Sequence, residues 1–397
     1  MVRRRTLFIG VIAILGLIAA ACGGAAIDQP SSPEPTSTST GKPASEAEAP
    51  EGVPMVDTSI ASVPLNRVVF DTFSLAGAVP LSEASEELIL RLRDAIPPLT
   101  NPRYDDVSGG DWLKPTDLVL GYASGGEVYA YPFKILNFHE IVNDVFDGVS
   151  ILISYCPLCR SAIVYDRRLN GQVLTFGNTS ALYENDLVMY DHQTGSYWYQ
   201  TGGEAIVGAL TRSRLDVIPS LVATWAEWRS IHPETSVLSR NTGFNRDYTR
   251  DPFEGYDNIV DAENFPFPVS ERGRDPRLNP AQEVLGVELG GIRVAYPLDN
   301  LGDAAINDLL GDIRIVVFSK KEGPSGAAYL SVANGQELTF EFEDGGFIDV
   351  ETGSIWNLAG VATQGPLKGA VLEPIPSRFT FWFSLVATFP DIEVYQP

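Results

Sequence analysis

Short strand-like runs dominate the pattern of apolar and polar residues along this chain. Asp117–Tyr122 and Glu127–Tyr131 alternate as half-buried strands do, and the Ser-Gly-Gly between them is a hairpin signal. Val149–Tyr155 is a continuous apolar run, which is typical of a fully buried strand. These runs predict a protein built mainly from short strands joined by tight turns.

Helical spacing is found in only a few segments. Apolar residues recur at this spacing over Phe133–Val142 and over Leu221–Ile231, with Ser220 as a candidate N-cap and Pro233 as a stop for the second segment. The pattern as a whole therefore predicts a β-rich α+β protein with a few short helices.

The pattern also repeats itself, which predicts an internal duplication. Residues of the same type recur in the same order over about 115 residues in each half. The matched pairs include Leu120 with Leu285, Tyr131 with Tyr296, Asn143 with Asn307, Asp191 with Asp349, and Trp198 with Trp356. We expect two copies of one lobe, each built round a small, mostly antiparallel sheet or barrel with short helices.

Composition and turn residues suggest boundaries for these parts. The predicted segments are a signal peptide at 1–21, a tether at 22–54, an N-terminal extension at 55–114, a first lobe at 115–245, a connection at 246–279 and a second lobe at 280–397.

The N-terminus has the pattern of a bacterial lipoprotein. Three arginines precede the apolar stretch Leu7–Ala21, and small residues stand directly before Cys22. The segment that follows is rich in Pro, Ser, Thr and Glu, so it cannot bury enough apolar surface to fold. We expect a lipid on Cys22 to anchor the folded part at the extracytoplasmic face of the cell membrane, in an oxidising compartment.

Charge restricts the partners further. The 51 acidic residues against 28 basic residues give a formal net charge of -23, which would repel phosphate backbones. We therefore expect no nucleic-acid partner, and the sequence does not identify a protein or small-molecule partner.

Candidate chemistry is concentrated in the first predicted lobe. Cys156-Pro157-Leu158-Cys159 lies between two predicted strands, the geometry of a metal-binding knuckle, and alignment of the two halves places Ser319 and Glu322 opposite the cysteines. His139 has no counterpart histidine either. We expect Cys156, Cys159 and His139 to bind zinc or copper, with Glu140, Asp191 or His192 available to complete the site.

Two other interpretations of the cysteine pair remain open. The pair could exchange disulfides as a thiol–disulfide oxidoreductase, or it could form a structural disulfide in a non-catalytic surface binding protein. The sequence does not decide whether any reaction is catalysed.

The order and spacing of these motifs resemble the prokaryotic domain of unknown function 3179 over roughly residues 75–397. The resemblance implies an extracytoplasmic location, as in many members, and no known activity. Arg160 stands where a small residue, often Gly, is expected. The residues that correspond to the family's motifs, and that could support a site, are His139, Glu140, Asn143, Asp144, Tyr155, Cys156, Cys159, Asp191 and Gln200.

Overall fold

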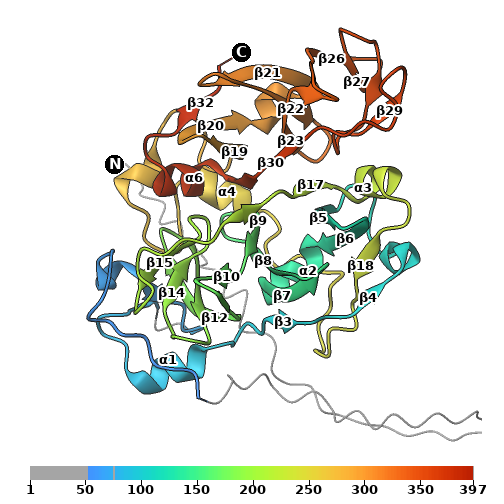
Figure 1. Cartoon of the computed structure of the whole chain (residues 1–397). Helices are drawn as coiled ribbons and strands as arrows, with labels where there is room; N and C mark the ends of the chain where they lie inside the picture. Colours follow the sequence, from blue (N-terminus) through green and yellow to red (C-terminus); the bar gives the residue numbers. More distant parts are fainter. Residues whose placement is uncertain (1–51, 75–76, 397) are drawn as a thin grey trace, which may run out of the picture.

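Strands are the commonest regular element of the computed structural model, which describes residues 52–74 and 77–396 (Figure 1). The described part contains two nine-stranded sheets, one six-stranded sheet, one four-stranded sheet and two two-stranded ribbons. None of these sheets closes into a barrel. The β-rich α+β class predicted from the sequence is confirmed.

The first nine-stranded sheet contains the strands on both sides of the cysteine pair. Its pairings are antiparallel except for β3 with β7 and β20 with β32. In spatial order it contains β3 (Leu99–Thr100), β7 (Ile141–Phe146), β8 (Val149–Cys156), β9 (Ser161–Asp166), β31 (Ser377–Phe381), β19 (Glu283–Leu289), β20 (Ile292–Pro297) and β32 (Glu393–Val394), and β16 (Val217–Ile218) also pairs with β9.

The second nine-stranded sheet is built in the same way. Only β18 and β6 pair in parallel. Its order is β21 (Ala304–Leu310), β22 (Ile313–Lys320), β23 (Ser325–Leu330), β17 (Leu221–Thr224), β5 (Leu118–Ser124), β6 (Glu127–Pro132), β18 (Ser236–Leu238) and β4 (Tyr104–Asp105), and β30 (Pro374–Ile375) also pairs with β23.

Smaller sheets extend each half. The six-stranded sheet contains β15 (Glu204–Val207), β14 (Tyr197–Tyr199), β13 (Asp186–Asp191), β12 (Phe176–Tyr183), β1 (Val69–Phe70) and β2 (Val79–Pro80). The four-stranded sheet contains β26 (Phe340–Glu343), β27 (Gly346–Asp349), β28 (Ile355–Trp356) and β29 (Ala362–Gln364). The ribbons pair β10 (Arg168–Leu169) with β11 (Gln172–Val173) and β24 (Val332–Ala333) with β25 (Gln336–Glu337).

The helices are short and lie between strands. The α-helices are α1 (Glu86–Leu92), α2 (Phe133–His139), α3 (Trp225–Ile231), α4 (Tyr256–Asp261), α5 (Leu298–Leu301) and α6 (Trp382–Thr388). The 3-10 turns are η1 (Leu65–Arg67), η2 (Val107–Gly110) and η3 (Glu271–Arg274).

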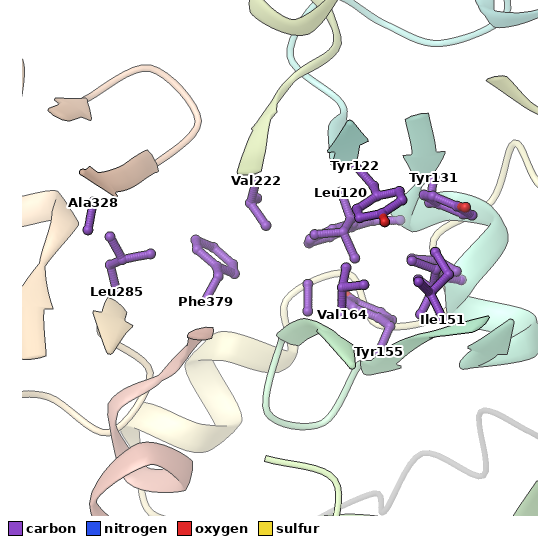
Figure 2. Packing of buried hydrophobic residues seen from close by; sticks show 14 of the residues in the cluster. Leu120, Tyr122, Tyr131, Ile151, Tyr155, Val164, Val222, Leu285, Ala328 and Phe379 are labelled. Atoms are coloured by element: carbon purple, nitrogen blue, oxygen red, sulfur yellow. The ribbon is translucent and has the colours of Figure 1, made fainter. Parts of the chain in front are cut away.

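Both large sheets combine strands from the two halves of the chain. Ala162 in β9 pairs with Phe379 in β31, and Val222 in β17 pairs with Gly326 in β23. The largest core cluster contains side chains from both halves, as Figure 2 shows for Tyr155 and Leu285, among others. The expectation that each lobe has a small sheet of its own therefore differs from the observed sheets, which continue from one half into the other.

The two predicted helices are both shorter than expected. Leu221–Thr224 pairs with β5 as strand β17, and helix α3 begins after it because the Thr224 hydroxyl, not Ser220, accepts a hydrogen bond from the Glu227 amide at 3.2 Å. A Thr followed three residues later by Glu is a helix start signal. Helix α2 ends at His139, where Glu140 adopts a φ of 57° and turns the chain into strand β7.

The order of elements is the same in both halves. The hairpin β5–β6, helix α2 and strands β7–β8–β9 are followed in the second half by β19–β20, α5 and β21–β22–β23. The β12–β13 hairpin, with strands of eight and six residues, is longer than the β26–β27 hairpin, whose strands have four residues each. This difference matters for the site described next.

Candidate functional site

The two cysteines lie at the turn between β8 and β9. Cys156 is the last residue of β8 and pairs with Ser161, the first residue of β9. Residues 157–160 therefore form a four-residue turn that contains Cys159. Arg160 has a φ of 48°, the left-handed region that glycine favours, which explains why a small residue is expected there. Both cysteines are free thiols, with exposed fractions of 1% and 0%.

The second half of the chain holds this turn in place. The Cys159 carbonyl accepts hydrogen bonds from the Phe381 amide at 2.8 Å and from the Thr380 hydroxyl at 3.1 Å, both in β31. The Arg160 guanidinium pairs with Glu283 of β19 at 2.6 Å. The position of the thiols therefore depends on strands more than 100 residues away in the sequence.

Asp186, the first residue of β13, completes a cluster of three potential metal ligands, two thiols and one carboxylate. The Cys159 thiol donates to Asp186 Oδ1 at 2.9 Å, and the Thr201 amide donates to Oδ2 at 3.0 Å. The two sulfurs and one carboxylate oxygen all lie within 4.8 Å of one another. The sequence analysis did not single out Asp186, because it lies in the longer part of the β12–β13 hairpin, for which the second half has no counterpart.

Gln200 contributes to the site, as the sequence predicted it could. The Ser161 hydroxyl lies 3.1 Å from Cys159 Sγ and donates to Gln200 Oε1 at 2.5 Å. Gln200 Nε2 donates to the Ser154 hydroxyl at 2.9 Å. All of these side chains are fully buried, so the thiols lie in a polar network inside the core.

This network is rich in acidic groups and has no cation of its own. Burial raises the pKa of Cys156, of Cys159 and of Asp186, and nearby carboxylates add to the effect on both thiols. Among the ion pairs of residues 52–74 and 77–396, none includes Asp186 or Glu140. A bound cation would offset the cost of burying these groups in their charged forms.

Glu140 lies close enough to the cysteine site to affect it electrostatically. Asn178 Nδ2 donates to its carboxylate at 2.7 Å, and burial raises the pKa of Glu140 to about 8, with a further contribution from Asp186. The strand that carries Asn178 has a bulge between Asn178 and Ala181. Glu140 is therefore buried close to the cysteine site, and its carboxyl group is mostly protonated at neutral pH.

Several residues round the site have backbone conformations that are unusual for side chains other than glycine. Glu140, Arg160, Ser180 and Asn185 all have φ between 48° and 57°. Ten other non-glycine residues of the described part of the chain also have a positive φ, so this feature is not specific to the site.

His139 lies outside the cluster of Cys156, Cys159 and Asp186. Its Nδ1 is 2.8 Å from the Pro97 carbonyl and its Nε2 is 2.6 Å from the Tyr248 hydroxyl, so both ring nitrogens already have partners. Burial lowers the pKa of His139 to about 4. Asp186, and not His139, is therefore the third group beside the thiols.

Three other predicted site residues make contacts that recur in the second half. The Asn143 side chain accepts a hydrogen bond from the Phe176 amide and donates one to the Phe176 carbonyl. Asn307 makes the same two hydrogen bonds with the backbone of Phe340, and all four are 2.8–2.9 Å long. Asp191 accepts from the Trp198 indole at 2.9 Å, and Asp349 accepts from Trp356 at the same distance. These contacts connect strands in both halves, which favours a structural role for Asn143 and Asp191.

Asp144 repeats one contact of its counterpart. Its Oδ1 accepts from the Val145 amide at 2.8 Å, as Asp308 Oδ1 accepts from the Leu309 amide at 2.7 Å. Its Oδ2 accepts from the hydroxyl of Tyr104 in β4 at 2.6 Å, whereas Asp308 Oδ2 accepts from Tyr296, the counterpart of Tyr131, at 2.8 Å. Tyr155 packs its ring against Phe133, with centroids 4.5 Å apart. Neither residue belongs to the cluster of ligand atoms.

His192 is also separate from the cysteines. Its ring stacks on Tyr190, with centroids 5.3 Å apart, and its Nε2 is buried with no hydrogen-bond partner. It is not one of the grouped ligands in the described part of the chain.

The corresponding positions of the second half lack this chemistry. Strand register places Lys320, and not Ser319, at the position of Cys156, because Lys320 pairs with Ser325 as Cys156 pairs with Ser161. Leu358 takes the position of Gln200, since the Tyr329 hydroxyl donates to the Leu358 carbonyl as Tyr165 donates to the Gln200 carbonyl. The buried polar network is present in the first half only.

The connection between the halves covers the cysteines. Tyr256 of α4 belongs to the same core cluster as both cysteines, and its hydroxyl accepts from Asn185 Nδ2 at 3.1 Å. The site is consequently closed on the side of α4.

The predicted anchor at Cys22 and the signal peptide lie outside the described residues. Within residues 52–74 and 77–396, no helix is both long and apolar enough to cross a bilayer.

Comparison with known proteins identifies the family of the chain. No curated protein and no solved structure matches it. A family model described as "Protein of unknown function (DUF3179)" matches residues 93–392, a range that includes the cysteine site and every strand of both large sheets except β32. The chain therefore belongs to the DUF3179 family.

Proposed function

We propose that this protein is a membrane-anchored, extracytoplasmic metal-binding protein whose first half holds a transition metal ion between Cys156, Cys159 and Asp186. The observation that carries the proposal is the cluster itself: three ligand atoms within 4.8 Å of one another, fully buried and without a cationic side chain paired to Asp186.

The type and spacing of the ligands favour zinc. Zn–S bonds of about 2.3 Å and Zn–O bonds of about 2.0–2.2 Å place tetrahedral ligand atoms roughly 3.5–4 Å apart. The three ligand atoms lie within 4.8 Å of one another, and Cys159 Sγ and Asp186 Oδ1, now 2.9 Å apart, would separate slightly to reach this spacing. Three protein ligands leave a fourth position for water or another ligand. Copper remains the second candidate because thiolates also select Cu(I), although a carboxylate is a poor ligand for this soft ion.

Disulfide exchange by the same cysteines is less well supported. A reactive thiol needs access and a lowered pKa, whereas Cys156 and Cys159 have exposed fractions of 1% and 0% and raised pKa values. A strand, and not a helix N-terminus, follows the turn. A bound metal ion would lower the pKa values of both thiols again, because coordination stabilises the thiolates directly.

An internal duplication with one degenerate copy explains why the site occurs once. The shared order of elements and the matching contacts of Asn143 and Asn307 support the duplication. Lys320 and Leu358 at the positions of Cys156 and Gln200 support the loss of the site from the second copy.

Metal analysis of the full-length protein, extracted in detergent without chelators, tests the proposal. We expect about one zinc or copper ion per chain, and loss of the ion in Cys159→Ser and Asp186→Asn, because each substitution removes one of three ligands. Asp344→Asn is the matched control, since Asp344 is an exposed hairpin carboxylate of the second half and should leave the metal content unchanged.

Two further observations would decide between the hypotheses. Wild-type protein with both thiols reduced and no stoichiometric metal would contradict metal binding, and a mixed disulfide trapped by Cys159→Ser would support the redox alternative. Cys22→Ser should release the protein from the membrane fraction but retain the metal, so the anchor and the metal site can fail independently.

A further inference from the structure

A hollow of about 650 Å³ lies apart from the cysteine site and shares no residue with it. Its walls come from two segments, 105–112 around η2 and 239–249 in the connection after β18. Sites that bind small molecules are commonly concave and carry a few converging polar groups. We therefore considered which groups on these walls lack a partner.

Two arginines of the hollow have no ion-pair partner in the described part of the chain. Arg240 lies over the ring of Trp112, 4.9 Å from its centroid, and Arg246 donates to the Asn245 carbonyl at 3.2 Å. Neither guanidinium has a carboxylate within 4.0 Å among residues 52–74 and 77–396. In a chain with 51 acidic and 28 basic residues, two unpaired arginines on one concave surface are unexpected.

Trp112 contributes its ring to the same wall, where it contacts Arg240. The carboxylates of Asp105, Asp111 and Asp247 also line the hollow and could accept hydrogen bonds from hydroxyl groups of a ligand.

Tyr248 connects this hollow to His139. The Pro97 carbonyl can only accept, so His139 Nδ1 carries the proton, and the neutral ring then accepts the Tyr248 proton at Nε2. The Thr242 hydroxyl, 2.6 Å from the Tyr248 oxygen, must then donate to it. This chain of hydrogen bonds fixes Tyr248 in the wall and gives a structural reason for the buried His139.

We propose that the hollow binds a small hydroxyl-bearing organic anion, whose carboxylate or phosphate lies between Arg240 and Arg246. Arginine recognises both kinds of oxyanion through paired, charge-assisted hydrogen bonds. Asp105, Asp111 and Asp247 disfavour a ligand without donor groups, since they would repel a bare anion.

Binding can be measured on the full-length protein through tryptophan fluorescence. The chain has six tryptophans, and the other five are buried, so acrylamide quenching reports mainly on Trp112. We expect glucuronate to protect Trp112 saturably, whereas glucose, which lacks only the carboxylate, should not. Glucose 6-phosphate distinguishes a phosphate ligand from a carboxylate ligand, and inorganic phosphate tests whether the hydroxyl groups are needed.

Variants test which residues provide the affinity. Arg240→Gln and Arg246→Gln should each weaken binding at least about tenfold, because each removes a charge-assisted contact. Arg250→Gln, an exposed arginine outside the lining, changes net charge equally and should bind as wild type does. Melting temperatures of the three variants establish that they remain folded.

Several results would overturn the proposal. Equal protection by glucose and glucuronate would show that the anionic group is not recognised. Equally tight binding of inorganic phosphate would show that the hydroxyl groups are not needed. No protection by either sugar anion, or unchanged affinity in both arginine variants, would show that the hollow is not this site. None of these results depends on metal at Cys156 and Cys159.

Discussion

Glu140 has a backbone conformation and a degree of burial that are both unfavourable for its side chain. It ends helix α2 with a φ of 57°, and the residue that ends the corresponding helix α5 is Gly302, which also has a positive φ, of 65°. A side chain at positive φ costs roughly 1–2 kcal/mol more than glycine does. Burial of the carboxyl group adds to this cost. A carboxyl group at so unfavourable a position favours a role for it beside the cysteine site.

The raised pKa of Glu140 predicts a specific pH dependence of stability. Because its pKa is about 8 in the folded protein and near its ordinary value of 4.5 when unfolded, the folded state binds more protons between these values. The free energy of unfolding should therefore fall as pH rises from about 5 to about 9. Glu140→Gln should flatten this decline in calorimetric melting curves. Glu83→Gln, at an exposed position, should leave it unchanged, and an unchanged slope in Glu140→Gln would contradict the prediction.

His139 should contribute to stability and not to metal retention. We expect His139→Gln to keep a full metal content, because His139 is outside the cluster of ligands. The loss of one buried hydrogen bond should cost about 1–2 kcal/mol in urea denaturation. Loss of metal in His139→Gln would contradict this prediction and show that His139 is a metal ligand.

The same variant should change the acid side of the stability profile. The pKa of His139 is about 4 when folded, below its ordinary value of 6.5, so the unfolded chain takes up the proton first. Wild-type stability should decline as pH falls from about 6.5 towards 4, and His139→Gln should lack this contribution.

For single residues, the sequence predicted which residues lie at the site better than it predicted which side chains contact one another. Cys156 and Cys159 were identified because the two halves of the chain differ at these positions, and Gln200 because it belongs to the family's motifs. Asp186 was missed because it lies in a longer hairpin, where the halves cannot be compared residue by residue. His139 was placed with the cysteines on ligand type alone, which carries no information about direction in space.

Among the elements, strand positions could be predicted well from alternation, and helix limits could not. The predicted strand Val149–Tyr155 is β8, which extends one residue further to Cys156. The predicted helix Leu221–Ile231 begins instead as strand β17, because Val222 pairs with both Leu120 and Gly326. Partners from distant parts of the chain overrode the local helical spacing, and a single sequence does not show such partners.

Two glycines at equivalent places allow a matched test of packing between elements. A Cβ atom on Gly121 would lie 2.1 Å from the Trp228 ring of α3, whereas one on Gly286 would lie 2.8 Å from a Leu385 methyl group of α6. The rigid indole cannot move aside, but the leucine can change rotamer. We expect Gly121→Ala to lower the free energy of unfolding by about 2–3 kcal/mol and Gly286→Ala by about 1 kcal/mol or less, as measured in urea. Equal losses would contradict this account.

For the whole molecule, shared sheets predict one cooperative unit. Each nine-stranded sheet contains strands from both halves, and the largest core cluster does so as well. Unfolding one half would therefore expose open edges and apolar surface in the other half. We expect urea unfolding followed by circular dichroism and by tryptophan fluorescence to give a single coincident transition. Two separated transitions would show that the halves unfold independently.

The pairing of β9 with β31 also has a consequence for how the chain acquires its structure. Ala162 finds its partner Phe379 only when nearly the entire polypeptide has been synthesised. Until then β16 covers the edge of β9 at Val164 and Tyr165, but the edge beside the cysteine turn, around Ala162, is open and can pair with other chains. Folding that depends on such distant contacts is slow and prone to aggregation. Protection of this edge during biosynthesis, by a chaperone or by delayed folding, is therefore a requirement that the topology itself imposes.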